Sequence, residues 1–280
     1  MISDEELAHL KTWVGRTETA RAVISTELVR RFRATLDDGV HEPENGEPAP
    51  LGIHWCLAPE VATASALGPD GHPPRGGFLP PVQLPRRMWA GGKLTFHDPL
   101  LVGDRVKRSS RVTAVEMKMG RSGPLCFVTV EHELRTGRAP ALSERQDIVY
   151  RGGGGLAAPP QVATPVTGTR REPFPTDPTL LFRYSAITFN GHRIHYDRDY
   201  ARDEEGYPDL VVHGPLQATK LLRLSAAMLE HPPKRFGFRG LSPLIVGQAA
   251  WLNAVGDSGG LALWVEDGQG QPTMAATAQG

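Results

Sequence analysis

The sequence contains little cysteine and no long hydrophobic run. Cys56 and Cys126 are the only cysteines among 280 residues, which excludes a disulfide framework and favours a reducing compartment. No apolar stretch approaches the roughly 20 residues that a membrane helix requires. The acidic start, MISDEELAHLKTW, is typical of neither a secretory signal nor a transit peptide. We therefore expect a cytoplasmic protein without a membrane partner.

Net charge is also missing. The 31 Lys and Arg residues balance 31 Asp and Glu residues, so the formal net charge is zero. A nucleic-acid interface needs clustered, uncompensated positive charge, so no nucleic-acid partner is expected, although a local basic pocket for a small anion stays open. Hydrophobic residues (40%) and charged residues (22%) have the balance of an ordinary globular protein with a sizeable core.

A Gly/Pro-rich segment, residues 151–178, divides the chain. It begins RGGGG and contains repeated prolines, which interrupt helices and central strands. Because loops of this length are uncommon inside compact domains, we interpret it as a linker between residues 1–150 and residues 179–280. A long surface loop within one domain is the alternative.

A short repeat supports two related halves. The stretch DPLLVGDRV, Asp98 to Val106, reappears after the linker as SPLIVGQAA, Ser242 to Ala250, with Pro, Leu, Val and Gly matching at one constant spacing. A match this short can arise by chance. Its equal spacing, its placement across the linker and the similar strand patterns downstream indicate an internal duplication.

Each half begins with helical patterning and continues with strands. Val, Thr and aromatic residues are frequent in the expected strands, and turn signals such as GRSG separate them. Helix followed by antiparallel strands is an α+β pattern in which a helix packs on a curved sheet. The expected helices are residues 5–13, 26–36 and 214–231, and the expected strands after Gly103 are residues 104–119, 124–136 and 144–151.

Three histidines lie close together in the second half: His192, His195 and His213. Zinc commonly takes such ligands, but the HExxH spacing that makes a zinc motif specific is absent, so we expect no metal. Each histidine could instead be a hydrogen-bonded polar residue at the edge of the core.

Gly214 stands where a long apolar helix begins. Val211 and Val212 end an extended segment, and Pro215 suits a first helical turn. A glycine at a helix N-terminus leaves backbone N–H groups free, and the partial positive charge there suits a developing oxyanion. A plain turn at Gly214 is the alternative.

The stretch YSAITFNGHRIHYDRDYA, followed by HGPLQATKLL, resembles the MaoC-like, R-specific enoyl-CoA hydratases and 3-hydroxyacyl-thioester dehydratases. The family's histidine falls on His195, its aspartate on Asn190, its asparagine on His192, its proline on Arg193 and its helix-initiating glycine on Gly214. With Asn190 in place of aspartate, the stretch resembles the branch of type 2 mitochondrial 3-hydroxyacyl-thioester dehydratases and of bacterial mesaconyl- and itaconyl-CoA hydratases.

The resemblance implies an α+β double hotdog fold, with a curved antiparallel sheet around a central helix in each half. GGFLPPVQLPRRMWAGGKLTF is similar to the N-terminal module of fused members. Residues 1–150 would then be a degenerate, substrate-binding hotdog, and residues 179–280 the catalytic hotdog.

The resemblance also implies roles for the site residues. His195 would be the general base toward water, Asn190 would orient that water because an amide has no useful basicity, and Gly214 N–H would stabilise a thioester enolate. Alternatively, Asp197 or Asp199 replaces the missing carboxylate. No metal or redox cofactor is expected, because CoA is part of the substrate.

Basic residues near the motif are candidate substrate contacts. A guanidinium at Arg193 could pair with a second carboxylate on the acyl group, unless it pairs with Asp197 or faces solvent. Arg86 and Arg87 are candidates for the same carboxylate or for CoA phosphates, with an exposed turn as the alternative. His192 and His213 complete the expected substrate-binding set, and we expect Trp89 to be a core residue.

The sequence thus predicts a hydratase that acts reversibly on a short, branched, unsaturated dicarboxylyl-CoA such as itaconyl-CoA or mesaconyl-CoA. A 3-hydroxyacyl-thioester dehydratase of fatty-acid metabolism is the alternative. A non-catalytic acyl-CoA-binding hotdog protein and a thioesterase are further alternatives, since fold alone does not assign chemistry. The expected partner is the acyl-CoA substrate, and a homodimer is possible.

Overall fold

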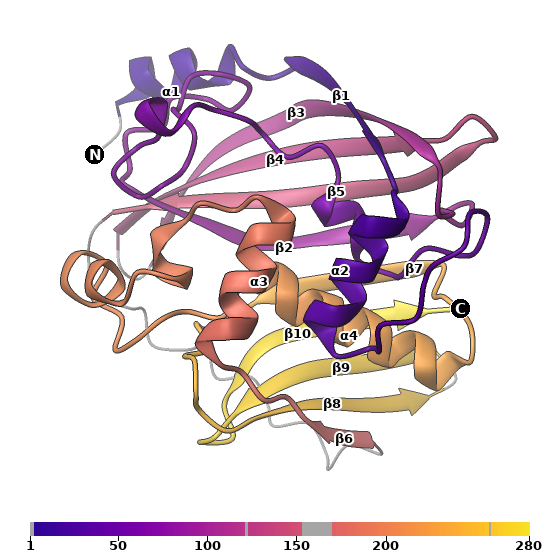
Figure 1. Cartoon of the computed structure of the whole chain (residues 1–280). Helices are drawn as coiled ribbons and strands as arrows, with labels where there is room; N and C mark the ends of the chain where they lie inside the picture. The colour runs from indigo at the N-terminus through magenta and orange to yellow at the C-terminus, as the bar shows by residue number, and fades with distance from the viewer. Residues whose placement is uncertain (1–2, 121–122, 153–169, 258) are drawn as a thin grey trace.

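A long antiparallel sheet forms the body of the protein in a computed structural model that describes residues 3–120, 123–152, 170–257 and 259–280 (Figure 1). Ten strands follow the order β1-β3-β4-β5-β2-β7-β10-β9-β8-β6. None of the described helices is long and apolar enough to cross a membrane. The α-helices are α1 (Asp4–Lys11), α2 (Thr26–Leu36), α3 (Pro178–Thr188) and α4 (Gly214–Leu229).

Each half of the chain supplies one half of the sheet. The first half provides β1 (Thr17–Val23), β2 (Arg86–Phe96), β3 (Arg105–Gly120), β4 (Gly123–Arg135) and β5 (Pro140–Arg151). The second half provides β6 (Arg170–Pro173), β7 (Arg235–Gly240), β8 (Ala250–Asp257), β9 (Gly260–Asp267) and β10 (Pro272–Gln279). The expected α+β double hotdog architecture is confirmed, with the difference that β2 pairs with β7 and joins the two sheets into one.

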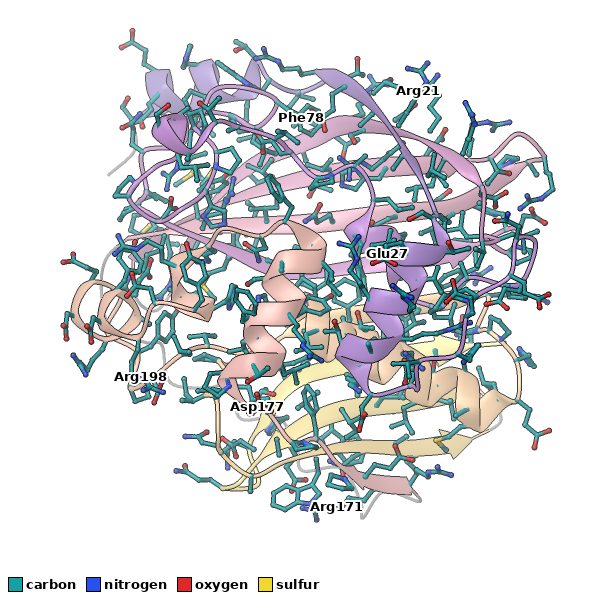
Figure 2. The ribbon with its side chains drawn as sticks, viewed as in Figure 1. Arg21, Glu27, Phe78, Arg171, Asp177 and Arg198 are labelled. Atoms are coloured by element: carbon teal, nitrogen blue, oxygen red, sulfur yellow. The ribbon has the colours of Figure 1, made fainter. Side chains whose placement is uncertain are left out.

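The internal duplication is visible in matching local geometry. Helices α2 and α3 each have 11 residues, a side-chain cap at the N-terminus and a left-handed residue at the C-terminus. Asp177, at the N-terminal end of α3 in Figure 2, accepts hydrogen bonds from the N–H groups of Thr179 and Leu180. Within the repeated sequence, Gly103 and Gly247 both have positive φ, 93° and 74°, and both turns lead into a strand.

The described part of the first half (residues 3–120 and 123–150) lacks the expected central helix. Ala49 donates its N–H to Leu100 just as Val212 donates to Leu244, so the segment after Ala49 corresponds to α4. Only η1 (Ile53–Cys56), a single 3-10 turn, forms there, because Pro59 follows almost at once and disfavours helical geometry in the residue before it. Helix α4, with 16 residues, contacts strands of both halves and buries Leu216, Leu221, Leu222 and Leu224.

The ends of the predicted linker belong to the fold. Arg151 is the last residue of β5, and Arg170–Pro173 forms β6, which pairs with β8. The second half therefore begins no later than residue 170, rather than at residue 179. Residues 153–169 of the predicted linker lie outside the described residues.

Two glycines allow the two halves to join. A Cβ atom on Gly91 would lie 2.6 Å from the carbonyl oxygen of Phe238, and one on Gly92 would lie 2.6 Å from the Arg145 oxygen and from the Phe238 ring. Phe238 in turn stacks on Trp89, with ring centroids 4.4 Å apart. The junction between β2 and β7 thus depends on the absence of side chains at these two positions.

We expect Gly92→Ala to lower the free energy of unfolding by about 1–3 kcal/mol, because the added methyl group meets backbone on one side and an aromatic ring on the other. Urea unfolding measures the loss. Gly77→Ala is the matched control, since its Cβ would meet no atom within 4 Å. Equal stability of the two variants would contradict this account of the junction.

Candidate active site

The motif loop begins where α3 ends. Phe189 adopts a left-handed conformation with φ of 53°, which turns the chain out of the helix. Asn190 then donates its N–H to the Ser185 oxygen, and its side-chain Oδ1 accepts the N–H of His192 at 3.0 Å. The amide oxygen of Asn190 therefore fixes the side chain within the loop, and its NH₂ group can donate to a ligand.

His195 is buried and held in one tautomer. Its Nδ1 donates to the carbonyl oxygen of Val211 at 2.7 Å, so Nε2 carries the lone pair. Within the described chain Nε2 makes no hydrogen bond, and it is not sealed from solvent. Burial, reinforced by His213 and His192, holds the pKa of His195 well below its ordinary value. His195 is thus a neutral imidazole with an available proton acceptor.

His213 supports the ring of His195. The two rings stack with centroids 3.7 Å apart and an interplanar angle of 20°, and His213 Nε2 bonds to Ser185 Oγ at 2.8 Å. Complete burial lowers the pKa of His213 to about 3. The expected substrate contact at His213 is not what this geometry offers, because the ring has no surface open to a ligand.

Gly214 is the first residue of α4, and no described acceptor takes its N–H. A Cβ atom here would lie 3.1 Å from Cε3 of Trp89, so glycine lets the indole pack closely on the helix N-terminus and a side chain would require the indole to shift by a few tenths of an ångström. Trp89 also stacks on Phe238 and is the core residue that we expected. His195 stacks on the ring of His213, the residue that caps α4 immediately before Gly214, so the His195 ring lies close to the N-terminus of this helix.

His192 lies between the motif and the first half. Its ring meets His195 edge-on, with centroids 5.4 Å apart, and Nε2 is 3.9 Å from Oε1 of Glu205. Arg86 pairs with the other oxygen of Glu205 at 3.2 Å. Burial would raise the pKa of Glu205, but His192 and Arg86 outweigh it and keep the pKa below its usual range.

Arg193 pairs with Asp197, which was the alternative to its pairing with a substrate carboxylate. Its Nε and Nη2 donate to Asp197 Oδ2 at 3.0 and 2.7 Å, its Nη1 donates to Pro69, and its guanidinium lies over the ring of Tyr200. Asp197 is thereby engaged, and Asp199 is a surface residue paired with Arg202. Among these carboxylates and Glu205, only Glu205 contacts a motif histidine.

Arg87 occupies a different setting. Arg86 and Arg87 open β2 and do not form an exposed turn. Arg87 pairs in register with Tyr150, and its charge contributes to lowering the pKa of His72 after burial. No carboxylate among the described residues lies within ion-pair distance of Arg87. Since alternate residues of a strand share a face, Arg87 and Trp89 project to the same side of β2.

A loop of the first half, residues 68–74, completes the site and was not identified from the sequence. Asp70 Oδ2 bonds to His72 Nδ1 at 3.0 Å, and the ring of His72 lies on that of His192 at 4.2 Å. Glu205 was missed as well. The stretch GPDGHPP gives a turn signal, but nothing in its composition indicates where the turn docks.

Asp70, His72 and His192 are also the one group of described residues that could hold a metal ion, with ligand atoms within 4.8 Å of one another. Both oxygens of Asp70 already accept hydrogen bonds from His72, one from its N–H and one from its ring. Local hydrogen bonding thus accounts for this arrangement.

The chemistry that the site offers is a neutral base beside a helix N-terminus, which suits proton transfer next to a carbonyl that gains negative charge.

Comparison with known proteins gives a consistent result. Residues 52–246 match the family model of type 2 hydroxyacyl-thioester dehydratases. The chain is 44% identical over 234 residues to mesaconyl-C(4)-CoA hydratase of Chloroflexus aurantiacus, which covers 83% of this chain and 84% of that protein.

Solved structures are similar in fold. A MaoC-like dehydratase from Phytophthora capsici superposes with a TM-score of 0.69 at 15% identity, covering 98% of both chains. A Mycobacterium tuberculosis protein with a double hotdog fold superposes with a TM-score of 0.57 at 13% identity, covering 95% of both chains.

We expect the protein to lose stability in mild acid, because burial disfavours the protonated form of several histidines. Burial lowers the pKa of His72 and His54 to about 4, whereas an unfolded chain titrates near 6.5. Below about pH 6.5 the unfolded state binds protons that the folded state does not, so the free energy of unfolding should fall between about pH 6.5 and 5. Urea unfolding across this range measures it. Carboxylates with a lowered pKa contribute to the pH dependence of the free energy of unfolding only below about pH 4.5. A free energy of unfolding that does not change between about pH 6.5 and 5 would therefore contradict the prediction.

Proposed function

The chain belongs to the family of type 2 hydroxyacyl-thioester dehydratases and is a hydro-lyase, and from this premise we propose that it reversibly adds water to a short, branched, unsaturated dicarboxylyl-CoA of the mesaconyl- or itaconyl-CoA type. The high identity with mesaconyl-C(4)-CoA hydratase over most of both chains carries the proposal. The neutral, accessible Nε2 of His195 beside the α4 N-terminus supports it.

The proposed reaction uses three groups of the second half. His195 Nε2 takes a proton from water while the water oxygen bonds to the β-carbon of the unsaturated acyl group. The electrons of the double bond move to the thioester oxygen, where the N–H of Gly214 and the positive end of α4 stabilise the enolate. The proton on His195 then passes to Cα. The reverse sequence removes water, and no metal or redox group is required.

Asn190 has a narrower role than an aspartate would have. Oδ1 already accepts the N–H of His192, and the NH₂ group can donate to the water oxygen. Such a contact would point a water hydrogen at His195 without competing for the proton. We therefore assign Asn190 to water orientation and the base to His195.

The second carboxylate of the acyl group needs a cation, and we propose Arg87. Arg193 is bonded to Asp197, and Arg86 is paired with Glu205, so binding a substrate at either would require breaking an existing pair. Arg87 lies near His72 and on the same side of β2 as Trp89, which packs on Gly214. A bidentate guanidinium–carboxylate pair would select dicarboxylyl substrates.

Dehydration of a 3-hydroxyacyl thioester in fatty-acid metabolism is the second candidate, favoured by the family description itself. It uses the same three groups in the reverse direction. It differs in needing space for a longer acyl chain and no cation for a second carboxylate. The preference between dicarboxylyl and simple acyl substrates therefore separates the two candidates.

His195→Ala should lower kcat/KM for mesaconyl-CoA by about 10²–10⁴-fold, since it removes the general base. Loss of the enoyl-thioester absorbance measures the rate. His231→Ala, which replaces an exposed histidine bonded only to Pro232, is the control. Activity of His195→Ala within about threefold of wild type would exclude His195 as the base.

Arg87→Ala should raise KM for mesaconyl-CoA by about 10–100-fold and leave crotonyl-CoA almost unaffected, because a charged hydrogen bond contributes about 1.5–3 kcal/mol. Arg239→Ala, an exposed arginine on the neighbouring strand, is the matched control. Equal effects of Arg87→Ala on both substrates would assign Arg87 to the CoA portion instead.

A further inference from the structure

The loop at residues 68–74 is seated on the motif loop by close backbone contact. A Cβ atom on Gly71 would lie 1.9 Å from the Gly191 oxygen, and one on Gly191 would lie 2.5 Å from the Gly71 oxygen. Arg193 fixes the same contact from its N–H to the Asp70 oxygen and from Nη1 to the Pro69 oxygen. The two loops, one from each half, therefore hold a defined position relative to each other.

The contact between the two loops places the side chains of Asp70 and His72 beside His192. Asp70 Oδ1 accepts the N–H of His72 at 3.0 Å, and Oδ2 accepts from Nδ1 at 3.0 Å, so one carboxylate fixes both the backbone and the ring of His72. Both side chains are 17% exposed. A partly buried, charge-assisted hydrogen bond of this kind holds a ring more firmly than packing alone.

The ring of His72 then contacts His192, and His192 contacts His195. Centroids are 4.2 Å apart in the first pair, with an interplanar angle of 39°, and 5.4 Å apart in the second, at 88°. His195 also stacks on His213. His195 thus contacts two histidine rings, and of these the ring of His192 is in contact with His72 of the first half.

We propose that Asp70 and His72 are positioning residues of the hydration site: they hold His192, and through it the base His195, in the orientation that the reaction needs. The inference rests on the proposed function. It makes the first half a working part of the catalytic centre in addition to a substrate-binding module. Asp70 and His72 act through His192 and need no contact of their own with the substrate.

Four variants test the proposal with the full chain and mesaconyl-CoA. His72→Ala should lower kcat by about 10–100-fold with KM within about threefold, since small misplacement of a reacting group has effects of this size. His72→Phe retains a ring against His192 but loses the hydrogen bond from Nδ1 to Asp70, so it should recover part, and not all, of the kcat that His72→Ala loses. His192→Ala should lower kcat similarly, and the double variant His72→Ala/His192→Ala should be no slower than His192→Ala alone, because the two residues act in series.

Asp70→Asn, compared with the exposed control Asp203→Asn, tests the carboxylate. The amide keeps its size but reverses the hydrogen bond to Nδ1, so His72 should change tautomer, and kcat should fall while the control is unaffected. Nitrogen NMR of labelled histidine reports the tautomers of His72 and His195 without turnover. This readout separates the two proposals if no thioester proves to be a substrate.

The proposal is overturned by any of three results. Multiplicative effects of His72→Ala and His192→Ala would show that the two residues act independently. A His72→Phe variant as slow as His72→Ala would show that the ring contact with His192 does not support the site. Unchanged His195 resonances in His72→Ala, together with unchanged kcat, would show that the loop only packs.

Discussion

The backbone pairing of β2 with β7 is the constraint on which the rest of the molecule depends. It converts two five-stranded sheets into one and removes two exposed edges that would otherwise need protection. It also brings the first half's Trp89 to the N-terminus of α4, which belongs to the second half. The site is therefore a product of the junction, and neither half contains all of its walls.

Exclusion of water decides the chemistry inside that junction. A free imidazole would be partly protonated near neutral pH, whereas burial keeps His195 and His213 neutral. Hydrogen bonds to fixed acceptors then select which nitrogen carries the lone pair: the Val211 oxygen does so for His195, and Asp70 does so for His72. A neutral imidazole held in this way can accept a proton at its free nitrogen.

Much of the fold could be predicted because local signals agreed with the tertiary structure. The helix expected at 26–36 is α2 with the same bounds, and the repeated PL-x-VG turns are superposable in hydrogen bonding. The motif led to His195, Asn190 and Gly214, because these residues are close in sequence to the elements that hold them. Helix α3 was missed, since it follows the Gly/Pro-rich segment. The contacts of Asp70, His72 and Glu205 could not be predicted, because they depend on how two segments far apart in the sequence pack together. The hydrophobic periodicity of a sequence predicts helices and strands but not such contacts.

The short η1 turn has a consequence for how the two halves share their work. By the matching hydrogen bonds, Pro50 and Leu51 stand where the second half has His213 and Gly214, and no long helix dipole follows them. A duplicated fold could have carried two equivalent centres that compete for thioester. In this chain the long helix and the motif histidines of the described residues lie in the second half, so we expect a single acyl-CoA per chain and a saturation curve that follows a simple hyperbola.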